Sequence, residues 1–241
     1  MGALRAAFRK WIQSTGYDFH KLPGDPGRDP YRDIRRLVGT KSPIVFDVGA
    51  NTGQTTNAIL QALPGATVHA FEPSAAAFEG MRRLSVMQKN VVLNNCALGA
   101  QSGEQTLFEN ASSDMSSLLP LGQDGWGRVQ ARTTVRVSTV DEYCADRDIP
   151  RIDLLKSDTQ GFELEVLKGA SRMLERRLVH LIYLEMNFAR LYEGMPRFDA
   201  LLGFLFDRGF ELIALYQIHY LKERAGWTDG LFINSARGSV D

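Results

Sequence analysis

The most informative stretch of the chain runs over residues 44–54 and reads Ile44-Val45-Phe46-Asp47-Val48-Gly49-Ala50-Asn51-Thr52-Gly53-Gln54. A short apolar run ends at Gly49, which is typical of a buried strand, and a helical pattern begins at Thr52. Gly49 and Gly53 let the backbone turn sharply and let a ligand approach without a Cβ in the way, and Asn51 tolerates a positive φ. The spacing G-x-x-x-G is not the dinucleotide fingerprint G-x-G-x-x-G, so we expect a different ligand at this strand–turn–helix unit.

Strand and helix patterns alternate beyond this stretch. The expected strands are Ile44–Val48, Thr67–Phe71, Val91–Leu98, Ile152–Lys156, Val179–Glu185, Phe210–Tyr216 and Gly230–Ile233, and the expected helices are Thr52–Leu63, Ala75–Met87, Glu163–Glu175 and Phe198–Arg208. This alternation predicts an α/β fold with a mostly parallel sheet and helices on both faces. The last two strands have no helix between them, which indicates a terminal antiparallel hairpin. Residues 100–140 interrupt the alternation as a β-rich or loop insertion.

The first 43 residues differ from the rest of the chain. Leu4, Ala7, Phe8, Trp11 and Ile12 recur at helical spacing and predict an amphipathic helix, which a Pro/Gly-rich loop follows. We therefore expect an N-terminal extension over residues 1–43 and one α/β domain over residues 44–241. The apolar face of the helix would pack on its own domain, on a second copy in a homodimer, or on a membrane surface.

The composition is that of an ordinary globular protein. The chain has 241 residues, 28 Lys+Arg against 28 Asp+Glu, and a hydrophobic share of 44%. Proteins that bind nucleic-acid phosphates over a broad surface usually have an excess of basic residues, and this chain has none. No nucleic-acid partner is therefore expected. Two cysteines, Cys96 and Cys144, cannot build a disulfide framework and are expected as buried thiols. Without a bilayer-length apolar run or a signal-peptide pattern, we expect no stable membrane insertion and a cytoplasmic location.

Two acids follow the first two strands and narrow the choice of ligand. Asp47 lies at the carboxyl end of the first strand, in the crevice where open α/β sheets bind ligands. A carboxylate there repels a pyrophosphate but attracts a cation such as an ammonium group. Glu72 ends the second strand, where an acid can hydrogen-bond both ribose hydroxyl groups. A nucleoside with a cationic tail and no phosphate fits both acids, which indicates S-adenosylmethionine.

Several motifs together resemble those of the FkbM-type S-adenosylmethionine-dependent methyltransferases. In chain order they are Asp47–Gly53, Ala70–Ser74, Asn95–Gly99, Ser138–Tyr143, Asp153–Glu163, Leu167–Ala170 and Tyr183–Glu185. The resemblance covers roughly residues 44–215, with Ser157 at a position that is usually apolar in the pattern. It implies a class I methyltransferase fold with a Rossmann-like sheet. It also implies an O-methyltransferase that acts on a small-molecule hydroxyl, in a sugar, a glycoside or a polyketide-type secondary metabolite.

The resemblance further implies roles for individual residues. The loop Asp47–Gln54 would hold the methionine part of the cofactor, Glu72 the ribose, and Cys96 with Ala97 would border the adenine. Asp158, at the end of a later strand, would face the sulfonium and the acceptor. The expected cofactor-binding residues are Asp47, Gly49, Asn51, Thr52, Gly53, Gln54, Glu72, Pro73, Cys96, Ala97 and Asp158.

Three residues are candidates for the base that takes the proton of the acceptor hydroxyl. Asp158 and Glu185 end two neighbouring strands, and His219 follows the strand Phe210–Tyr216 near its carboxyl end. Asn187 lies two residues beyond Glu185. Asp158, Glu185 and Asn187 could therefore bind Mg²⁺ instead, or hydrogen-bond the hydroxyl groups of a sugar.

Three features near these candidates receive structural interpretations. Lys156 is expected to point to the other face of its strand. Glu163 is expected to act as a negative charge at a helix N-terminus. The small polar residues 112–117 are typical of a mobile loop, which suits a lid.

Other functions remain open at this point. The same fold could serve a methyltransferase that acts on RNA or protein, or a non-catalytic scaffold that binds the cofactor. The neutral charge counts against RNA. The intact loop Asp47–Gly53 and Glu72 count against a scaffold. A nicotinamide dehydrogenase is excluded by the missing glycine fingerprint.

Overall fold

Five parallel strands form the centre of the molecule. A computed structural model describes residues 2–15, 26–87 and 89–234 and orders these strands β8-β7-β1-β2-β3. They are β1 (Ile44–Val48), β2 (Thr67–Phe71), β3 (Val91–Asn94), β7 (Ile152–Ser157) and β8 (Val179–Asn187). Their apolar runs are buried on both faces, as in other parallel sheets. The expected strand–helix alternation is therefore confirmed.

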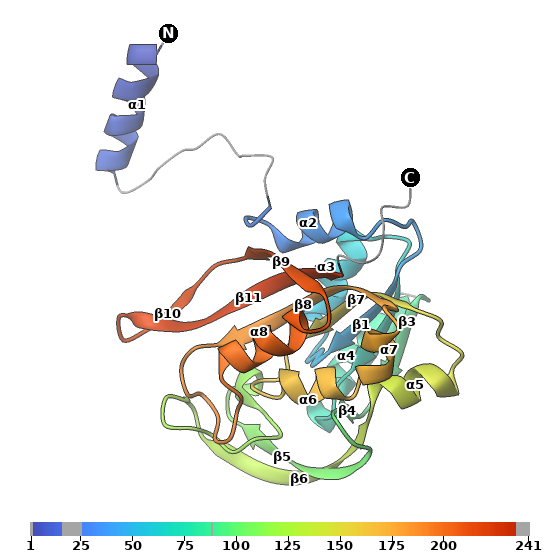
Figure 1. Cartoon of the computed structure of the whole chain (residues 1–241). Coiled ribbons are helices and arrows are strands. Elements are labelled where there is room, and N and C mark those ends of the chain that lie inside the picture. Colours follow the sequence, from blue (N-terminus) through green and yellow to red (C-terminus); the bar gives the residue numbers. More distant parts are fainter. Residues whose placement is uncertain (1, 16–25, 88, 235–241) are drawn as a thin grey trace.

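Antiparallel strands complete the sheet beyond β8 (Figure 1). β11 (Arg224–Asn234) lies antiparallel to β8, and on its other side it pairs with β10 (His219–Leu221) and then with β9 (Phe210–Leu215). This confirms a mostly parallel sheet that ends in antiparallel strands. The final strand is longer than the expected Gly230–Ile233, because it has partners along both edges.

Helices cover both faces of the sheet (Figure 1). Successive strand residues point to opposite faces, so Val45 and Leu154 join one core while Phe46 and Leu155 join the other. The first core includes residues of α2 (Pro30–Leu37), α3 (Gln54–Ala62) and α4 (Ala75–Met87). The second includes residues of α5 (Val140–Asp146), α6 (Glu163–Lys168), α7 (Ser171–Glu175) and α8 (Phe198–Phe206).

The insertion expected over residues 100–140 is β-rich. β5 (Gly103–Asn110) and β6 (Val129–Ser138) pair antiparallel, and β4 (Ala97–Leu98) joins β6 in a second, three-stranded sheet. A short 3-10 turn, η1 (Ser113–Met115), follows β5. The single strand expected over Val91–Leu98 is wrong. Asn94 pairs with the last residue of β2, so the chain beyond it has no partner in the main sheet and joins the second sheet instead.

The single helix expected over Glu163–Glu175 is also wrong. The structure has two helices, α6 and α7, with a break at Gly169 and Ala170. Gly169 packs so closely on the chain that a Cβ there would overlap the carbonyl oxygen of Gly99. The break lets the backbone of this segment rest directly on the chain that enters the inserted sheet.

The N-terminal amphipathic helix is present as α1 (Gly2–Ser14). Its Phe8 and Trp11 rings stack with centroids 5.9 Å apart, and both side chains are exposed. Residues 21–25 of the expected Pro/Gly loop lie outside the described residues. Across the described ranges, no helix combines the length and apolar character that crossing a bilayer requires.

A second N-terminal helix, α2, lies in a region that was expected to form only a loop. The side chain of Asp29 caps it by accepting hydrogen bonds from the backbone N–H groups of Tyr31 and Arg32. Pro30 stands at its start, where a missing N–H costs nothing. Ile34 of this helix packs into the same core as β1, so part of the expected extension belongs to the body of the domain.

Candidate active site

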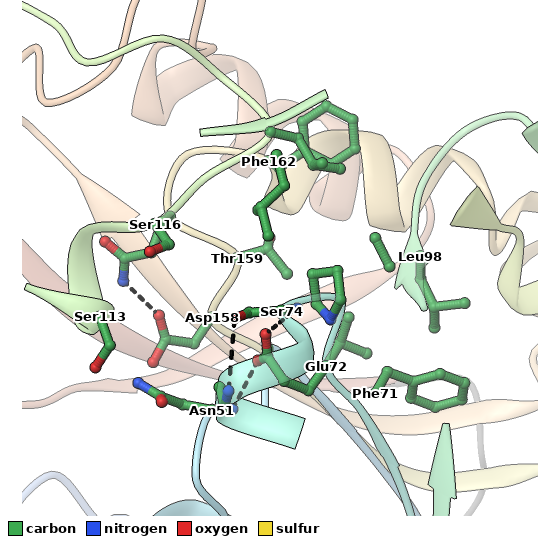
Figure 2. Close-up of a pocket in the computed structure, with 18 of the residues that line it drawn as sticks. Asn51, Phe71, Glu72, Ser74, Leu98, Ser113, Ser116, Asp158, Thr159 and Phe162 are labelled. Carbon is green, nitrogen blue, oxygen red and sulfur yellow. Dashed lines mark hydrogen bonds between the residues drawn. The ribbon is translucent and has the colours of Figure 1, made fainter. Parts of the chain in front are cut away.

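A cavity opens at the carboxyl ends of β1, β2 and β7, where open α/β sheets bind ligands (Figure 2). The turn after β1 supplies Gly49 and Asn51 to its wall, and the end of β2 supplies Glu72 and Ser74. Further lining residues come from β4, from the inserted loop after β5 and from the segment that follows β7. They include Ala97, Leu98, Ser113, Asp114, Ser116, Leu118, Asp158, Thr159, Gln160 and Phe162. The loop expected as a lid thus borders the cavity.

Glu72 is held rigidly at the edge of this cavity. One carboxylate oxygen accepts the backbone N–H of Asn51 at 2.8 Å, and the other accepts that of Ser74 at 2.8 Å (Figure 2). Burial raises the pKa of Glu72, and the two backbone N–H groups oppose that shift. Each oxygen has two acceptor positions, so the carboxylate keeps one on each oxygen for a ligand. That arrangement suits a pair of neighbouring hydroxyl groups.

The turn after β1 is shaped by two residues in the left-handed region. Gly49 has φ 75°, and a Cβ there would overlap the carbonyl oxygen of Asp158. Asn51 has φ 49°, a conformation that Asn adopts more readily than most residues. The backbone N–H groups of Gly49 and Ala50 both donate to the carbonyl of Phe71 at 3.0 Å, which fixes the turn beside β2.

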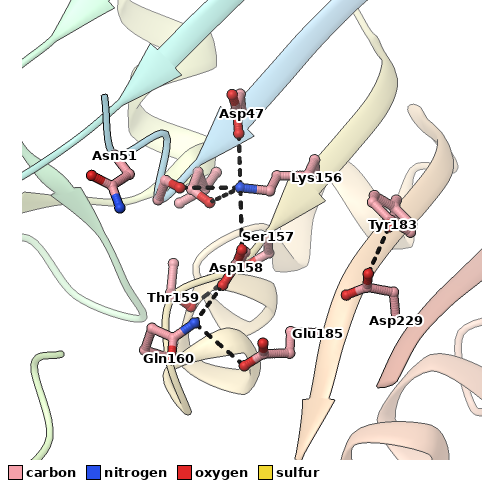
Figure 3. Close-up of polar contacts among 12 residues, drawn as sticks. Asp47, Asn51, Lys156, Ser157, Asp158, Thr159, Gln160, Tyr183, Glu185 and Asp229 are labelled. Carbon is pink, nitrogen blue, oxygen red and sulfur yellow. Dashed lines mark hydrogen bonds and ion pairs between the residues drawn. The ribbon is translucent and has the colours of Figure 1, made fainter. Parts of the chain in front are cut away.

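Asp47 supports this turn from beneath. Its carboxylate is fully buried, accepts the Thr56 hydroxyl at 2.5 Å and lies 3.0 Å from Lys156 Nζ (Figure 3). Lys156 Nζ also donates to the carbonyl of Gly49 at 3.1 Å and lies 3.8 Å from Asp158 Oδ2. The structure thus places Asp47 under the loop, outside the cavity lining, where a ligand ammonium would not reach it.

The orientation expected for Lys156 is wrong. Lys156 Nζ lies close to the carboxylates of both Asp47 and Asp158, so its side chain points toward the site. Its ammonium is buried at the centre of the site. Burial lowers the pKa of Lys156, but the nearby carboxylates of Asp47 and Asp158 outweigh that effect and raise it overall. This cation therefore neutralises the acids beneath the turn.

A chain of hydrogen bonds links the ends of β7 and β8. Gln160 Nε2 donates to Asp158 Oδ1 at 2.7 Å and to Glu185 Oε1 at 3.5 Å (Figure 3). Tyr192 donates its hydroxyl to Gln160 Oε1 at 2.6 Å, which fixes the orientation of the amide. Asp158 and Glu185 therefore lie on either side of one side-chain amide. Neither Gln160 nor Tyr192 was singled out in the sequence, although Gln160 stands two residues after Asp158 in a motif.

Two further carboxyl groups near this chain are buried. Glu163 accepts the backbone N–H of Thr159 at 2.7 Å and its hydroxyl at 3.1 Å, and burial raises the pKa of Glu163 to about 7. Burial, with the charges of Asp158 and Glu163, raises the pKa of Glu185 well above its ordinary value. Glu163 does begin α6, but its side chain turns inward to hold the segment after β7 rather than outward as a surface charge.

The geometry gives the Mg²⁺ hypothesis no support. Gln160 places an N–H group between Asp158 and Glu185, and Asn187 turns its own amide N–H toward Glu185 at 3.0 Å. An amide nitrogen donates and does not ligate a hard cation. Within the described ranges, no group of three His, Cys, Asp or Glu side chains is arranged to hold a metal ion.

The other expected site residues divide between the cavity and its surroundings. Pro73 and Ala97 line the cavity, whereas Cys96 is buried in the core behind it. Gly53 caps the N-terminus of α3 with φ 92°, and Thr52 and Gln54 flank it outside the cavity lining. The two cysteines are buried and free, as expected.

His219 lies away from the cavity, on the edge strand β10. Its ring stacks on that of Trp227 with centroids 4.8 Å apart and an interplanar angle of 6°. Trp227 in turn packs against Trp126, with centroids 5.4 Å apart. The contacts of His219 are those of a packed aromatic stack, and its role as a base stays a prediction.

The fold and this cavity define the class of the protein. Class I, S-adenosylmethionine-dependent methyltransferases share three features with this protein. These are a mostly parallel sheet that ends in antiparallel strands, a glycine turn after β1 and an acid after β2. Residues 47–212 match the family model described as "Methyltransferase FkbM domain". The chain therefore belongs to the FkbM methyltransferase family, which confirms the resemblance drawn from the motifs.

Three methyltransferases are similar to this chain over about half of its length or more. The 2-O-methyltransferase NoeI of Sinorhizobium fredii is 26% identical over 197 residues, which cover 77% of this chain and 79% of the relative. The hexuronic acid methyltransferase AglP of Haloferax volcanii is 27% identical, covering 65% of this chain and 62% of the relative. A 31-O-demethyl-FK506 methyltransferase, FkbM of Streptomyces tacrolimicus, is 30% identical, covering 52% of this chain and 58% of the relative.

Solved structures support the fold. A methyltransferase FkbM from Methylobacillus flagellatus matches with TM-score 0.52 and 17% identity. The match covers 80% of this chain but only 44% of that solved chain. SMU.1697c of Streptococcus mutans, a protein solved with S-adenosylhomocysteine, matches with TM-score 0.50 and 16% identity over 84% of this chain and 94% of that one. At these identities the likeness establishes the fold alone.

Proposed function

We propose that this enzyme transfers the methyl group of S-adenosylmethionine to a hydroxyl group of a small molecule such as a sugar or glycoside. The observation that carries the proposal is the anchored carboxylate of Glu72, which faces a cavity that also contains Asp158. The names of two relatives, a 2-O-methyltransferase and a hexuronic acid methyltransferase, favour an oxygen atom of a carbohydrate as acceptor.

The cavity residues fit S-adenosylmethionine. Glu72 would accept the ribose hydroxyl groups on its two remaining acceptor positions. Asn51 lines the cavity, and its Oδ1 is buried without a donor among the described residues, so it would accept a hydrogen bond from the ammonium group. Ala97 and Leu98 offer apolar surface for the adenine. Bound there, the cofactor supplies a methyl group attached to a sulfonium.

The enzyme contributes position and a proton acceptor. Holding the acceptor oxygen in line with the sulfur–methyl bond is worth up to about 7–11 kcal/mol. As the oxygen–carbon bond forms and the carbon–sulfur bond breaks, the hydroxyl proton passes to a carboxylate. Asp158 is the first candidate because it lines the cavity, and Gln160 restrains it. Glu185, on the other side of the same amide, is the second.

Calorimetry and methyl transfer test the proposal together. S-adenosylhomocysteine should bind, and its affinity should be the same in Mg²⁺ as in EDTA. Mass spectrometry should then detect one added methyl group on a member of a panel of methyl glycosides incubated with S-adenosylmethionine. Failure to bind S-adenosylhomocysteine would contradict the assignment of the cofactor to this cavity. Binding without methylation of any hydroxyl compound would contradict the acceptor class.

A further inference from the structure

A second hollow lies beside the cofactor cavity, over the segment that follows β8. It is an open groove of about 680 Å³, bordered by Asn187, Phe188, Arg190, Tyr192 and Phe198. A smaller pocket adjoins it, shares Asn187 and Phe198 with it, and adds Glu163 and Glu185. The groove thus leads from solvent down to the buried carboxyl groups of the site.

Asn187 is the unusual residue in this groove. The residue is buried, with only 6% of its surface exposed. Its Nδ2 donates to Glu185 Oε1 at 3.0 Å. Its Oδ1 is left buried with no hydrogen-bond partner among the described residues. Burying a hydrogen-bond acceptor without a donor costs free energy. A ligand that donates a hydrogen bond to this oxygen would remove that cost.

A continuous chain of hydrogen bonds joins Asn187 to the cofactor cavity. Asn187 Nδ2 donates to Glu185 Oε1 at 3.0 Å. Gln160 Nε2 lies 3.5 Å from the same oxygen and donates to Asp158 Oδ1 at 2.7 Å (Figure 3). Asp158 lines the cavity and Asn187 lines the groove. A ligand that spans both would meet hydrogen-bond acceptors at each end.

We propose that this groove is the acceptor subsite, and that Asn187 Oδ1 accepts a hydrogen bond from a second hydroxyl group of a polyhydroxylated, glycosyl acceptor. This inference rests on the proposed function. It requires an acceptor with at least two hydroxyl groups. One hydroxyl group lies beside Asp158 and receives the methyl group, and the other donates a hydrogen bond to Asn187 Oδ1. A ligand with a single hydroxyl group would leave the Asn187 oxygen unsatisfied and bind more weakly.

The rest of the groove suits a sugar. Phe188 and Phe198 pack edge to face with ring centroids 5.2 Å apart, and they supply apolar surface for the C–H groups of a pyranose. Arg190 and Glu193 add polar groups to the lining. Mixed polar and aromatic linings of this kind bind ligands that are themselves both polar and apolar.

The test is a titration of the full chain, loaded with S-adenosylhomocysteine, with methyl hexopyranosides and their monodeoxy analogues, followed by ligand-detected NMR. For the wild-type enzyme, we expect removal of one particular hydroxyl group to weaken binding about tenfold. For Asn187→Leu and Asn187→Ala, the complete glycoside and that deoxy analogue should bind equally. The smaller Ala variant guards against misfolding of the Leu variant, and S-adenosylhomocysteine affinity reports whether each is folded.

Gln61→Leu is the matched control, because it makes an amide-to-Leu change at an exposed residue of α3 that does not line the groove. It should retain the preference for the complete glycoside. If S-adenosylhomocysteine binds but no glycoside does, or if the Asn187 variants keep the wild-type preference, the inference is overturned while the proposed function stands. If S-adenosylhomocysteine does not bind the wild-type enzyme, the proposed function itself fails.

Discussion

At the scale of single residues, Glu72 lines the cofactor cavity and also holds two segments of the backbone in place. Its two oxygens bind backbone N–H groups from two separate segments, the turn after β1 and the start of α4. In Glu72→Gln, one of those N–H groups would face an amide NH₂ group instead of an acceptor. We expect S-adenosylhomocysteine affinity to fall by about 1–3 kcal/mol in calorimetry. Glu79→Gln, an exposed change nearby, should leave it unaltered, and equal affinities in the two variants would contradict the role.

Lys156 is the second residue whose change has a defined consequence. In Lys156→Met, the buried carboxylate of Asp47 would lose its cation, which costs about 3–5 kcal/mol of unfolding free energy. Urea denaturation measures this loss, and Asp47→Asn in the same chain should recover part of it. Lys168→Met, which breaks an exposed pair, should change stability by less than about 0.5 kcal/mol. A comparable loss in both single variants would show that burial of the pair is not what matters.

At the scale of elements, the break between α6 and α7 depends on backbone contact rather than on helix propensity. Gly169→Ala would place a Cβ against the carbonyl oxygen of Gly99, which is backbone and cannot move freely. We expect destabilisation of about 1–3 kcal/mol, measured by urea denaturation. Gly203→Ala in α8 is the control, because an added Cβ there meets no described atom within 4 Å. That change should stabilise the protein by up to about 1 kcal/mol. Equal effects at both positions would refute the contact argument.

At the scale of the whole molecule, buried acids gather at the carboxyl edge of the sheet although the net charge of the chain is zero. Burial raises the pKa of Glu163 to about 7, so the folded state keeps a proton that the unfolded state releases from about pH 4.5 upward. Stability from this proton is therefore complete below that pH and is lost as the pH rises to about 7. Glu72, Glu185 and Asp229 have raised pKa values as well, chiefly through burial, and act in the same direction.

Glu163→Gln tests this dependence. The variant keeps an oxygen that accepts the N–H of Thr159 but cannot ionise. We expect its unfolding free energy to fall less than that of the wild type between about pH 5 and about pH 8, as measured by urea denaturation. Glu175→Gln, at an exposed position of α7, should retain the wild-type slope. A wild-type slope in Glu163→Gln would mean that the other buried acids account for it.

How far the sequence predicted the site depended on how far apart the interacting residues are in the chain. The glycine turn after β1 and the acid after β2 were predicted to lie together at the carboxyl ends of their strands, and both line one cavity in the structure, because backbone conformation and strand order place them there. The ion pair between Asp47 and Lys156 was not predicted, because the two residues lie on neighbouring strands but 109 residues apart in the chain. The amide of Gln160 was missed for the same reason: its partner Glu185 lies on another strand.

The sequence by itself determined the alternation of strands and helices, the antiparallel end of the sheet and the residues that turn the chain after β1, since these follow from hydrophobic period and local conformational preference. The tertiary structure alone decided where Val91–Leu98 breaks, which carboxylates are neutralised, and that Asn187 Oδ1 is left without a donor. Each of these depends on which segments become neighbours and which side chains are excluded from water, and neither property is encoded at any single position.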